Sequence, residues 1–91
     1  MEHANDADLV GRFIKNGRLV IMPSKRGKLR VVLDHIAQEF EPGKTYAEAE
    51  VNDVLQGYHD DYAALRRYLV DEGFMTRDGG VYWRTGGTVH V

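Results

Sequence analysis

Hydrophobic residues recur at helical spacing in four parts of the chain, and strand-like runs lie between and after them. The clearest pattern predicts a helix over residues 25–40, where apolar side chains fall at i, i+3, i+4, i+7, i+8 and i+11. These positions are Leu29, Val32, Leu33, Ile36, Ala37 and Phe40. We therefore expect one face of this helix to lie in the core, with Ser24 as its N-cap and Glu41-Pro42-Gly43 as its end.

A shorter helix and a strand are predicted before this helix. Residues 8–15 have helical spacing and are followed by Asn16-Gly17, a typical stop signal. Residues 18–22 are mostly apolar and β-branched, and Pro23 closes the run, which is typical of a strand.

Two more helices are predicted after residue 44. Thr45 and Glu48 have the spacing of a capping box, so the first helix is expected to start at Thr45 and to end at Gly57, in a left-handed conformation. Asp60-Asp61 suits the N-terminus of the second, which runs to about Glu72. The predicted inward side chains are Val51, Val54 and Leu55 in the first helix and Tyr62, Leu65, Leu69 and Val70 in the second.

A β-hairpin is predicted over residues 74–84, with the turn at Asp78-Gly79-Gly80 because glycine accepts positive φ. The order of elements predicts an α+β fold that is winged helix-turn-helix-like, with a three-helix core plus a β-hairpin wing and an extra N-terminal helix and strand. We expect a single domain over residues 1–91, in which residues 85–91 either add a third strand or fray. The compact part is expected at about residues 8–84, between flexible segments 1–7 and 85–91.

Length and composition favour a binding module over an enzyme. The 91 residues include no cysteine, which excludes disulfides, thiol nucleophiles and cysteine-bound zinc. So short a chain leaves little room for both a core and a substrate cleft. Since no catalytic triad, P-loop or dinucleotide motif is present, we expect neither enzymatic activity nor a cofactor. No apolar run is long enough to span a membrane and the start of the chain does not resemble a secretory signal, so we expect no membrane partner and a cytoplasmic location.

Charge is distributed unevenly along a chain whose net charge is only −2. Between Leu9 and Leu33 there are seven basic residues and no acid, whereas the rest of the chain holds five basic residues and all 14 acids. Two explanations remain open. Either acids from the rest of the chain pair with this basic segment inside the protein, or the basic segment faces an anionic partner.

The start of the helix over residues 25–40 is the predicted anion-binding site. Its backbone N–H groups and helix dipole favour an anion, and the basic side chains there oppose the dipole, so a phosphate of nucleic acid or of a small ligand would balance them. The alternative is a carboxylate of the same chain. The candidate residues are Arg18, Ser24, Lys25, Arg26, Lys28 and Arg30.

The last helix is predicted to point mixed charges outward. Its expected outer positions are Asp61, Ala64, Arg67, Tyr68 and Asp71. Because acids repel phosphate, base recognition in a major groove by this helix is disfavoured, but Arg67 remains a candidate contact. Arg66 is expected to have a structural role and to pair with an acid of the preceding helix. The acids within reach are Glu48, Glu50 and Asp53.

His59-Asp60-Asp61 contains ligand types that bind divalent metals. A metal site would need more histidines around it, and helix capping already explains the two aspartates. We therefore expect no metal site here.

Several motifs occur in the order found in a known family. They are Gly17-Arg18-Leu19, Pro23-Ser24-Lys25, Tyr46-Ala47-Glu48-Ala49-Glu50-Val51-Asn52, His59-Asp60-Asp61-Tyr62-Ala63-Ala64-Leu65-Arg66-Arg67 and Tyr82-Trp83-Arg84. Over residues 13–84 the chain resembles the bacterial domain of unknown function 2087 family, and residues 85–91 lie outside that pattern. The resemblance implies a domain that is found alone or appended to transcription-regulator helix-turn-helix domains, with no activity assigned to it.

The resemblance also directs attention to nine charged or polar positions. They are Lys25, Glu48, Glu50, Asn52, Asp60, Asp61, Arg66, Arg67 and Arg84. The mixture of acids and bases among them favours an internal ion-pair network over a row of phosphate contacts.

Two functions are consistent with these observations. The first is a winged-helix-like module of transcription regulation that binds DNA or another phosphate-bearing ligand through residues 18–30. The alternative is a protein-interaction or dimerisation domain without DNA binding. Its partner would be a second copy or a regulator protein, bound at the hairpin or at the last helix.

Overall fold

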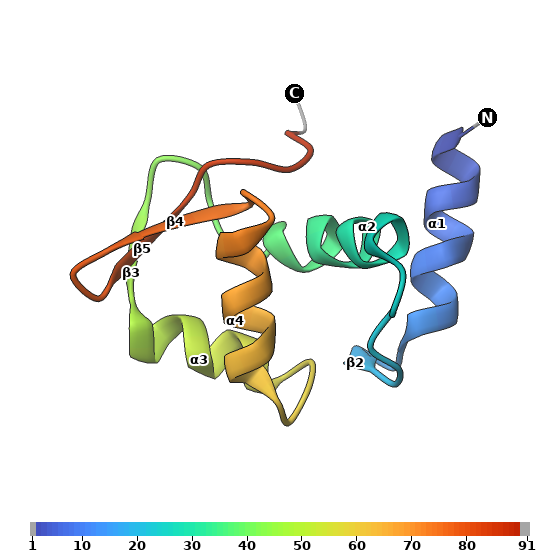
Figure 1. Cartoon of the computed structure of the whole chain (residues 1–91), viewed down its shortest axis with the longest axis horizontal. Coiled ribbons are helices and arrows are strands. Elements are labelled where there is room, and N and C mark those ends of the chain that lie inside the picture. Colours follow the sequence, from blue (N-terminus) through green and yellow to red (C-terminus); the bar gives the residue numbers. More distant parts are fainter. Residues whose placement is uncertain (1, 90–91) are drawn as a thin grey trace.

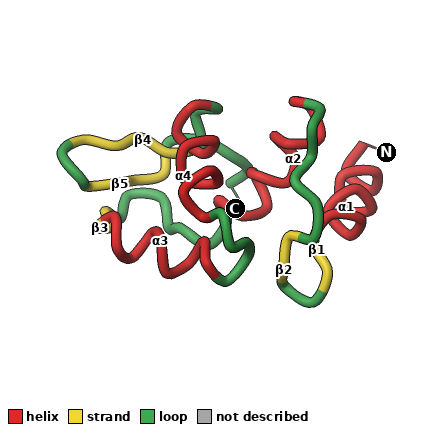
Figure 2. The backbone as a smooth tube through the Cα atoms, turned by 60° about the horizontal axis from the view of Figure 1, so that its bottom comes forward, coloured by secondary structure: helices red, strands yellow, loops and turns green. Residues whose placement is uncertain are grey.

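The computed structural model describes residues 2–89, and the side chains of residues 7–89. Across this range the chain forms four helices and two small antiparallel sheets, which confirms the predicted α+β class. In chain order they are α1 (Glu2–Phe13), β1 (Ile14–Lys15), β2 (Arg18–Leu19), α2 (Arg26–Ala37), β3 (Thr45–Ala47), α3 (Glu48–Gln56), α4 (Tyr62–Asp71), β4 (Met75–Asp78) and β5 (Val81–Arg84). Helix α1 lies beside α2 at one end of the molecule, and β3, β4 and β5 lie at the other (Figures 1 and 2).

One hydrophobic core joins α2, α3 and α4 to the three-stranded sheet. The stripe predicted for the helix at residues 25–40 is confirmed, since all its positions from Val32 to Phe40 are fully buried and Leu29 packs against them. The other fully buried side chains include Val51 and Leu55 of α3, Leu65 and Leu69 of α4, and Met75 and Tyr82 of the sheet. Burial of these apolar faces drives the helices together, because each helix is too short to be stable alone.

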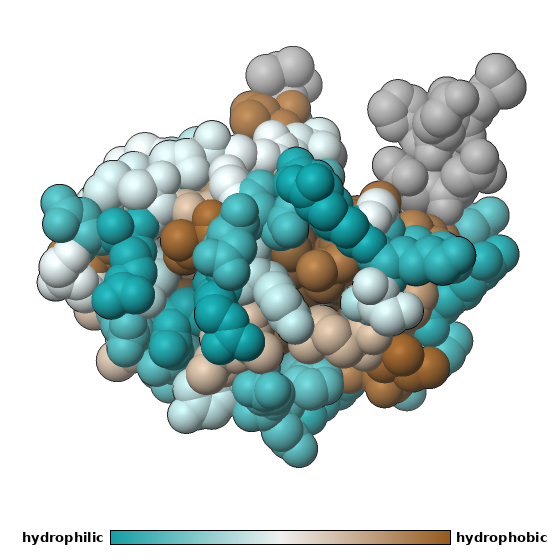
Figure 3. All heavy atoms as spheres, viewed as in Figure 1, coloured by the Kyte–Doolittle hydropathy of each residue, from teal (hydrophilic) through white to brown (hydrophobic). Residues whose placement is uncertain are grey.

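The first hairpin differs from the sequence prediction. Helix α1 begins at Glu2, before the predicted start at residue 8, and Asn16-Gly17 is the turn between β1 and β2, with φ of 54° and 77°. The predicted strand over residues 18–22 is too long, because the chain leaves β2 after Leu19. Val20 and Ile21 are consequently 48% and 61% exposed, and an apolar patch is visible in Figure 3 in the area where Figure 1 draws β2.

Two predicted N-caps are wrong by a few residues. Helix α2 starts at Arg26, so Lys25 holds the cap position and Ser24 lies one residue too early. Helix α3 starts at Glu48 because Thr45–Ala47 pairs with β5, and the Glu50 carboxylate accepts the Ala47 N–H at 2.8 Å.

The two later helix ends were predicted with mixed success. Gly57 has φ −65°, so the left-handed end predicted for α3 is wrong; its N–H bonds to the Val54 carbonyl in a tight last turn instead. Helix α4 ends at Asp71, close to the predicted end at about Glu72, and Gly73 follows with φ +82°. Asp61 caps α4 as predicted, accepting the Ala64 N–H at 3.2 Å.

The hairpin predicted over residues 74–84 is confirmed as β4 and β5, with Gly79 and Gly80 at positive φ in the turn. Its third strand is β3, which pairs with β5 so that Tyr46 lies opposite Tyr82. The sheet order is β3-β5-β4, so the third strand comes from between α2 and α3, and residues 85–89 add no strand to it.

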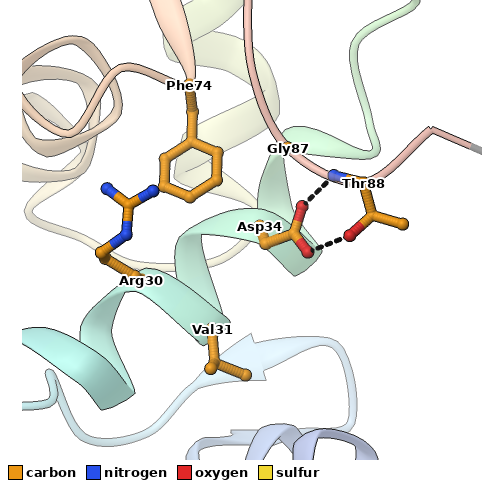
Figure 4. A pocket seen from close by; sticks show the side chains of 6 residues that line it. All are labelled: Arg30, Val31, Asp34, Phe74, Gly87 and Thr88. Atoms are coloured by element: carbon orange, nitrogen blue, oxygen red, sulfur yellow. Dashed lines mark hydrogen bonds between the residues drawn. The ribbon is translucent and has the colours of Figure 1, made fainter. Parts of the chain in front are cut away.

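Residues 85–88, which we expected to be flexible or to add a strand, fold back onto α2. The Asp34 carboxylate accepts the Thr88 N–H and hydroxyl, both at 2.7 Å (Figure 4). The buried Arg84 guanidinium donates to the carbonyls of Phe40, Gly86 and Thr88. This segment therefore supplies two of the oxygens that hold a buried charge. The parts of the flexibility prediction that concern residues 1, 90 and 91 lie outside the described residues.

Gly86→Ala should destabilise the protein by about 1–3 kcal/mol. A methyl group at this position would lie 2.5 Å from the Gly73 carbonyl oxygen, a backbone atom that cannot move aside cheaply. Gly27→Ala is the matched control, since nothing lies within 4 Å of its added methyl and alanine favours the helix. Thermal melts followed by circular dichroism should show a lower melting temperature for Gly86→Ala only. Equal melting temperatures for the two variants would contradict the packing of this segment.

Candidate nucleic-acid interface

Arg18, the first of the candidate phosphate contacts, is paired inside the protein. From β2 its guanidinium donates to the Gln56 carbonyl at 2.7 Å and to Asp60 Oδ1 at 3.0 Å. Arg18 therefore fixes the first hairpin to the loop before α4, and it also neutralises one of the acids at the start of that helix.

Arg26 and Arg30 share a single carboxylate, that of Glu72 directly after α4. Arg26 Nε and Arg30 Nη1 both lie 2.9 Å from Glu72 Oε1, and Arg30 also donates to the Glu72 carbonyl at 2.8 Å. The Arg30 guanidinium carbon lies 4.8 Å from the centre of the Phe74 ring. The hydrogen bonds from Arg30 and Arg26 hold the pKa of Glu72 below its usual value. For Arg26 and Arg30, the anion predicted at the start of α2 is therefore the Glu72 carboxylate of the same chain.

Ser24, Lys25 and Lys28 remain exposed at the start of α2. Within the part of the chain whose side chains are described, no carboxylate lies within 4 Å of either lysine, and the first turn of α2 contains no acid. These residues are the portion of the predicted anion site that still faces solvent.

The acids at the start of α4 make local contacts. Asp60 pairs with Arg18, and Asp61 caps the helix. Arg67 is exposed as predicted, and its guanidinium lies 5.8 Å from the Tyr68 ring. Ala64 was predicted to face outward and is instead buried, at 8% exposure, in a helix that packs against α2, α3 and β4. On this side of the molecule Asp60, Asp61, Arg67 and Asp71 remain exposed, and Arg18 offsets the charge of Asp60.

Arg66 contacts α3, as its predicted structural role requires. It donates to the side-chain oxygen of Asn52, and its Nε lies 3.9 Å from Glu48 Oε1. The same Glu48 oxygen accepts the Tyr82 hydroxyl at 2.8 Å, and burial together with this bond raises the pKa of Tyr82. Sequence reasoning missed Asn52 as a partner because it considered only charged residues.

The other two acids predicted as partners of Arg66, Glu50 and Asp53, make no ion pair with it in the described part of the chain. Glu50 accepts the Ala47 N–H at the start of α3. Asp53 is exposed on α3, and in the described part of the chain it makes no ion pair within 4 Å.

These ion pairs lie in a segment that a family model recognises. The model described as an uncharacterised protein conserved in bacteria (DUF2087) matches residues 18–84. The chain belongs to the DUF2087 family. Its match extends from β2 to β5 and leaves α1 and residues 85–89 outside. No curated protein and no solved structure matches the chain significantly.

Arg77 is a residue of the DUF2087 domain that sequence reasoning did not place at the site. It lies on β4 and lines a pocket of about 210 Å³ together with Arg66 and Arg67 of α4. The sequence feature that could have pointed to Arg77 is its position in the predicted hairpin, next to the last helix in the chain. Arg77 shares a face of the hairpin with the buried Met75, two residues earlier, and lies opposite the buried Tyr82, so the alternation along β4 could have shown that it faces α4.

A second pocket of the DUF2087 domain lies between α2 and residues 85–88 (Figure 4). Its volume is about 310 Å³, and its charged groups are Arg30 and Asp34. Both are already bonded within the protein, Arg30 to Glu72 and Asp34 to Thr88. This pocket therefore offers a ligand few available polar groups.

His59 makes a local contact in the DUF2087 domain. Its Nδ1 accepts the Asp61 N–H at 2.9 Å. In the described part of the chain, no three His, Cys, Asp or Glu side chains are grouped so as to hold a metal ion.

No helix in the described residues has the length and apolar character needed to cross a membrane.

Acid should weaken the contact between Glu72 and the two arginines. Because the pKa of Glu72 is lower in the folded than in the unfolded protein, its stabilising contribution is complete above the unfolded value of about 4.3 and is lost as the pH falls through the folded value. The difference in melting temperature between the unmodified protein and Glu72→Gln should be positive at neutral pH and should shrink below about pH 4.3.

Glu41→Gln is the control for this experiment, because Glu41 is exposed in the turn before β3. Its difference from the unmodified protein should stay near zero across the range. A Glu72→Gln difference that does not change between neutral and acid pH would contradict the assigned contact.

Proposed function

We propose that this domain is a winged-helix-like module that binds nucleic acid in transcription regulation. The order α2, β3, α3, α4, β4, β5 resembles that of a winged helix-turn-helix domain. The pairing of β3 with β5 is the observation on which this interpretation rests, because it joins the strand before α3 to the hairpin after α4. In this proposal helix α4 would serve as the recognition helix and the β4–β5 hairpin, which follows it in the chain, as the wing (Figures 1 and 2). A helix exposed in this way can enter a major groove about 12 Å wide.

The contacts of the acids in α4 support this proposal. Asp60 and Asp61 lie at the start of α4, where they bind Arg18 and cap the helix. Arg67 stays exposed further along the helix, and Lys25 and Lys28 stay exposed at the start of α2. A phosphate backbone would therefore meet cations on two elements, whereas Arg18, Arg26 and Arg30 serve mainly to hold the fold together.

The domain should bind duplex DNA with a strong dependence on salt. Each phosphate contact releases counterions, so log K should fall with log[salt] by about 0.9 per contact. Fluorescence anisotropy with a labelled duplex at about 50 and 200 mM salt measures this slope. No binding at low salt, or a slope near zero, would overturn the proposal.

Variants of the two exposed lysines test the surface used. Lys25→Gln Lys28→Gln should weaken binding equally for every duplex sequence, because phosphate contacts carry no sequence information. Arg12→Gln Lys15→Gln removes the same charge from α1 and β1 and is the matched control. Equal effects of the two double variants would show that only net charge matters.

A protein-interaction or dimerisation domain is the second candidate, and a different surface favours it. Val20 and Ile21 are adjacent, apolar and exposed, and they directly follow β2, which lies at the end of the molecule away from the β4–β5 hairpin (Figure 2). Adjacent apolar side chains on a surface are more typical of a contact site than isolated ones.

If this surface joins two copies, light scattering at high concentration should show a dimer that Ile21→Ser converts to a monomer, because serine removes apolar area from the contact. Val89→Ser is the control, since Val89 is equally exposed at 61% but lies near the other end of the chain. A monomer at all concentrations in the unmodified protein would count against dimerisation.

A further inference from the structure

The pocket between α4 and the hairpin gathers three arginines from two elements. Arg66 and Arg67 come from α4 and Arg77 from β4, and Asp71 contributes the single acidic side chain in its lining. The formal charge of these four side chains is +2, and the Glu48 carboxylate, 3.9 Å from Arg66 Nε, offsets part of it and leaves the site positive. We infer that this pocket binds one phosphate group.

Arg66 is the fixed part of this pocket. Its side chain is only 23% exposed, and contacts with Asn52 and Glu48 of α3 hold it in place. A guanidinium that is already held loses little conformational freedom when it binds a ligand. Arg67 and Arg77 are exposed and can approach the ligand from the two sides of the pocket.

The chemistry of the lining favours phosphate over other ligands. Guanidinium groups form paired hydrogen bonds with oxyanions, and a phosphate offers more oxygens than a carboxylate, so it can accept such paired bonds from more than one arginine at the same time. Pockets that enclose whole drug-sized molecules begin at about 300 Å³, and this one measures about 210 Å³, so it suits a single anionic group.

Asp71 allows a variant with the opposite effect. It lies one helical turn after Arg67, lines the same pocket and is exposed. Its negative charge opposes an anion there, so Asp71→Asn should tighten binding. A gain of affinity cannot be explained by loss of folding.

This inference deepens the proposed function, and it rests on that function only for the source of the phosphate. In nucleic acid the phosphate belongs to the backbone, and in a small ligand it is a free phosphoryl group. The two sources share the same contacts with Arg67 and Arg77, and the experiment separates them.

The test uses the full chain with two probes, a labelled DNA duplex followed by anisotropy and inorganic phosphate followed by ³¹P NMR line broadening. Arg67→Gln and Arg77→Gln should each weaken duplex binding about tenfold and lower the salt slope by about 1. Asp71→Asn should strengthen it. Arg12→Gln, which removes the same charge from α1, should change it little, and circular dichroism confirms that each variant is folded.

The outcomes separate the site from the function. Duplex binding that keeps its affinity and slope in Arg67→Gln and Arg77→Gln overturns the inference and leaves the proposed function standing. Phosphate broadening that both arginine variants abolish, without any duplex binding, supports the site with a small phosphorylated ligand and overturns the proposed function. If the unmodified protein binds neither probe, both proposals fail.

Discussion

The fold depends on the burial of the apolar faces of α2, α3 and α4 in one core, and the Glu72 carboxylate, which holds Arg26 and Arg30 at the same time, adds a polar contact between α2 and the end of α4. The two arginines come from the start of α2, and Glu72 follows the last residue of α4, so this contact fixes two core helices that are far apart in the sequence. It also pairs two of the basic side chains, Arg26 and Arg30, for which the sequence predicted a phosphate site at the start of α2. A charge that stabilises the fold in this way is less available to a ligand, because binding would first have to break hydrogen bonds to a carboxylate of low exposure, 16% for Glu72.

The remaining arginines divide in the same manner between internal and external use. Arg84 is buried and donates hydrogen bonds to three carbonyls, and Arg66 contacts Asn52 and Glu48 of α3. Arg67 and Arg77 are exposed on either side of one pocket. In the described residues three acids, Glu48, Asp60 and Glu72, pair with arginines that hold elements together, and Arg67 and Arg77 remain exposed at the junction of α4 and the hairpin. This is the junction that the proposed winged-helix interpretation would place against nucleic acid.

Local patterns in the sequence were sufficient for the elements that depend on local rules. The buried stripe from Val32 to Phe40, the Asp61 cap and the hairpin turn at Gly79 and Gly80 follow from helix spacing, capping and backbone conformation. Strand β3 was missed because a three-residue run has no periodicity of its own and forms only by pairing with β5, a contact between residues 36 positions apart at Tyr46 and Tyr82. The same contact moved the start of α3. The charge pattern revealed a basic segment and left two explanations open, and only the tertiary contacts show which arginines have internal partners.

The central claim is that Arg18, Arg26 and Arg30 of the basic segment are used inside the fold, and that the arginines that contact a ligand are Arg67 of α4 and Arg77 of the hairpin. The most direct measurement is to follow the arginine side-chain Nε–H resonances by ¹⁵N NMR while duplex DNA is added. The account predicts that the resonances of Arg67 and Arg77 move, whereas those of Arg26 and Arg30 keep their positions because Glu72 still holds them. Movement of Arg26 and Arg30 with Arg67 and Arg77 unchanged would contradict it.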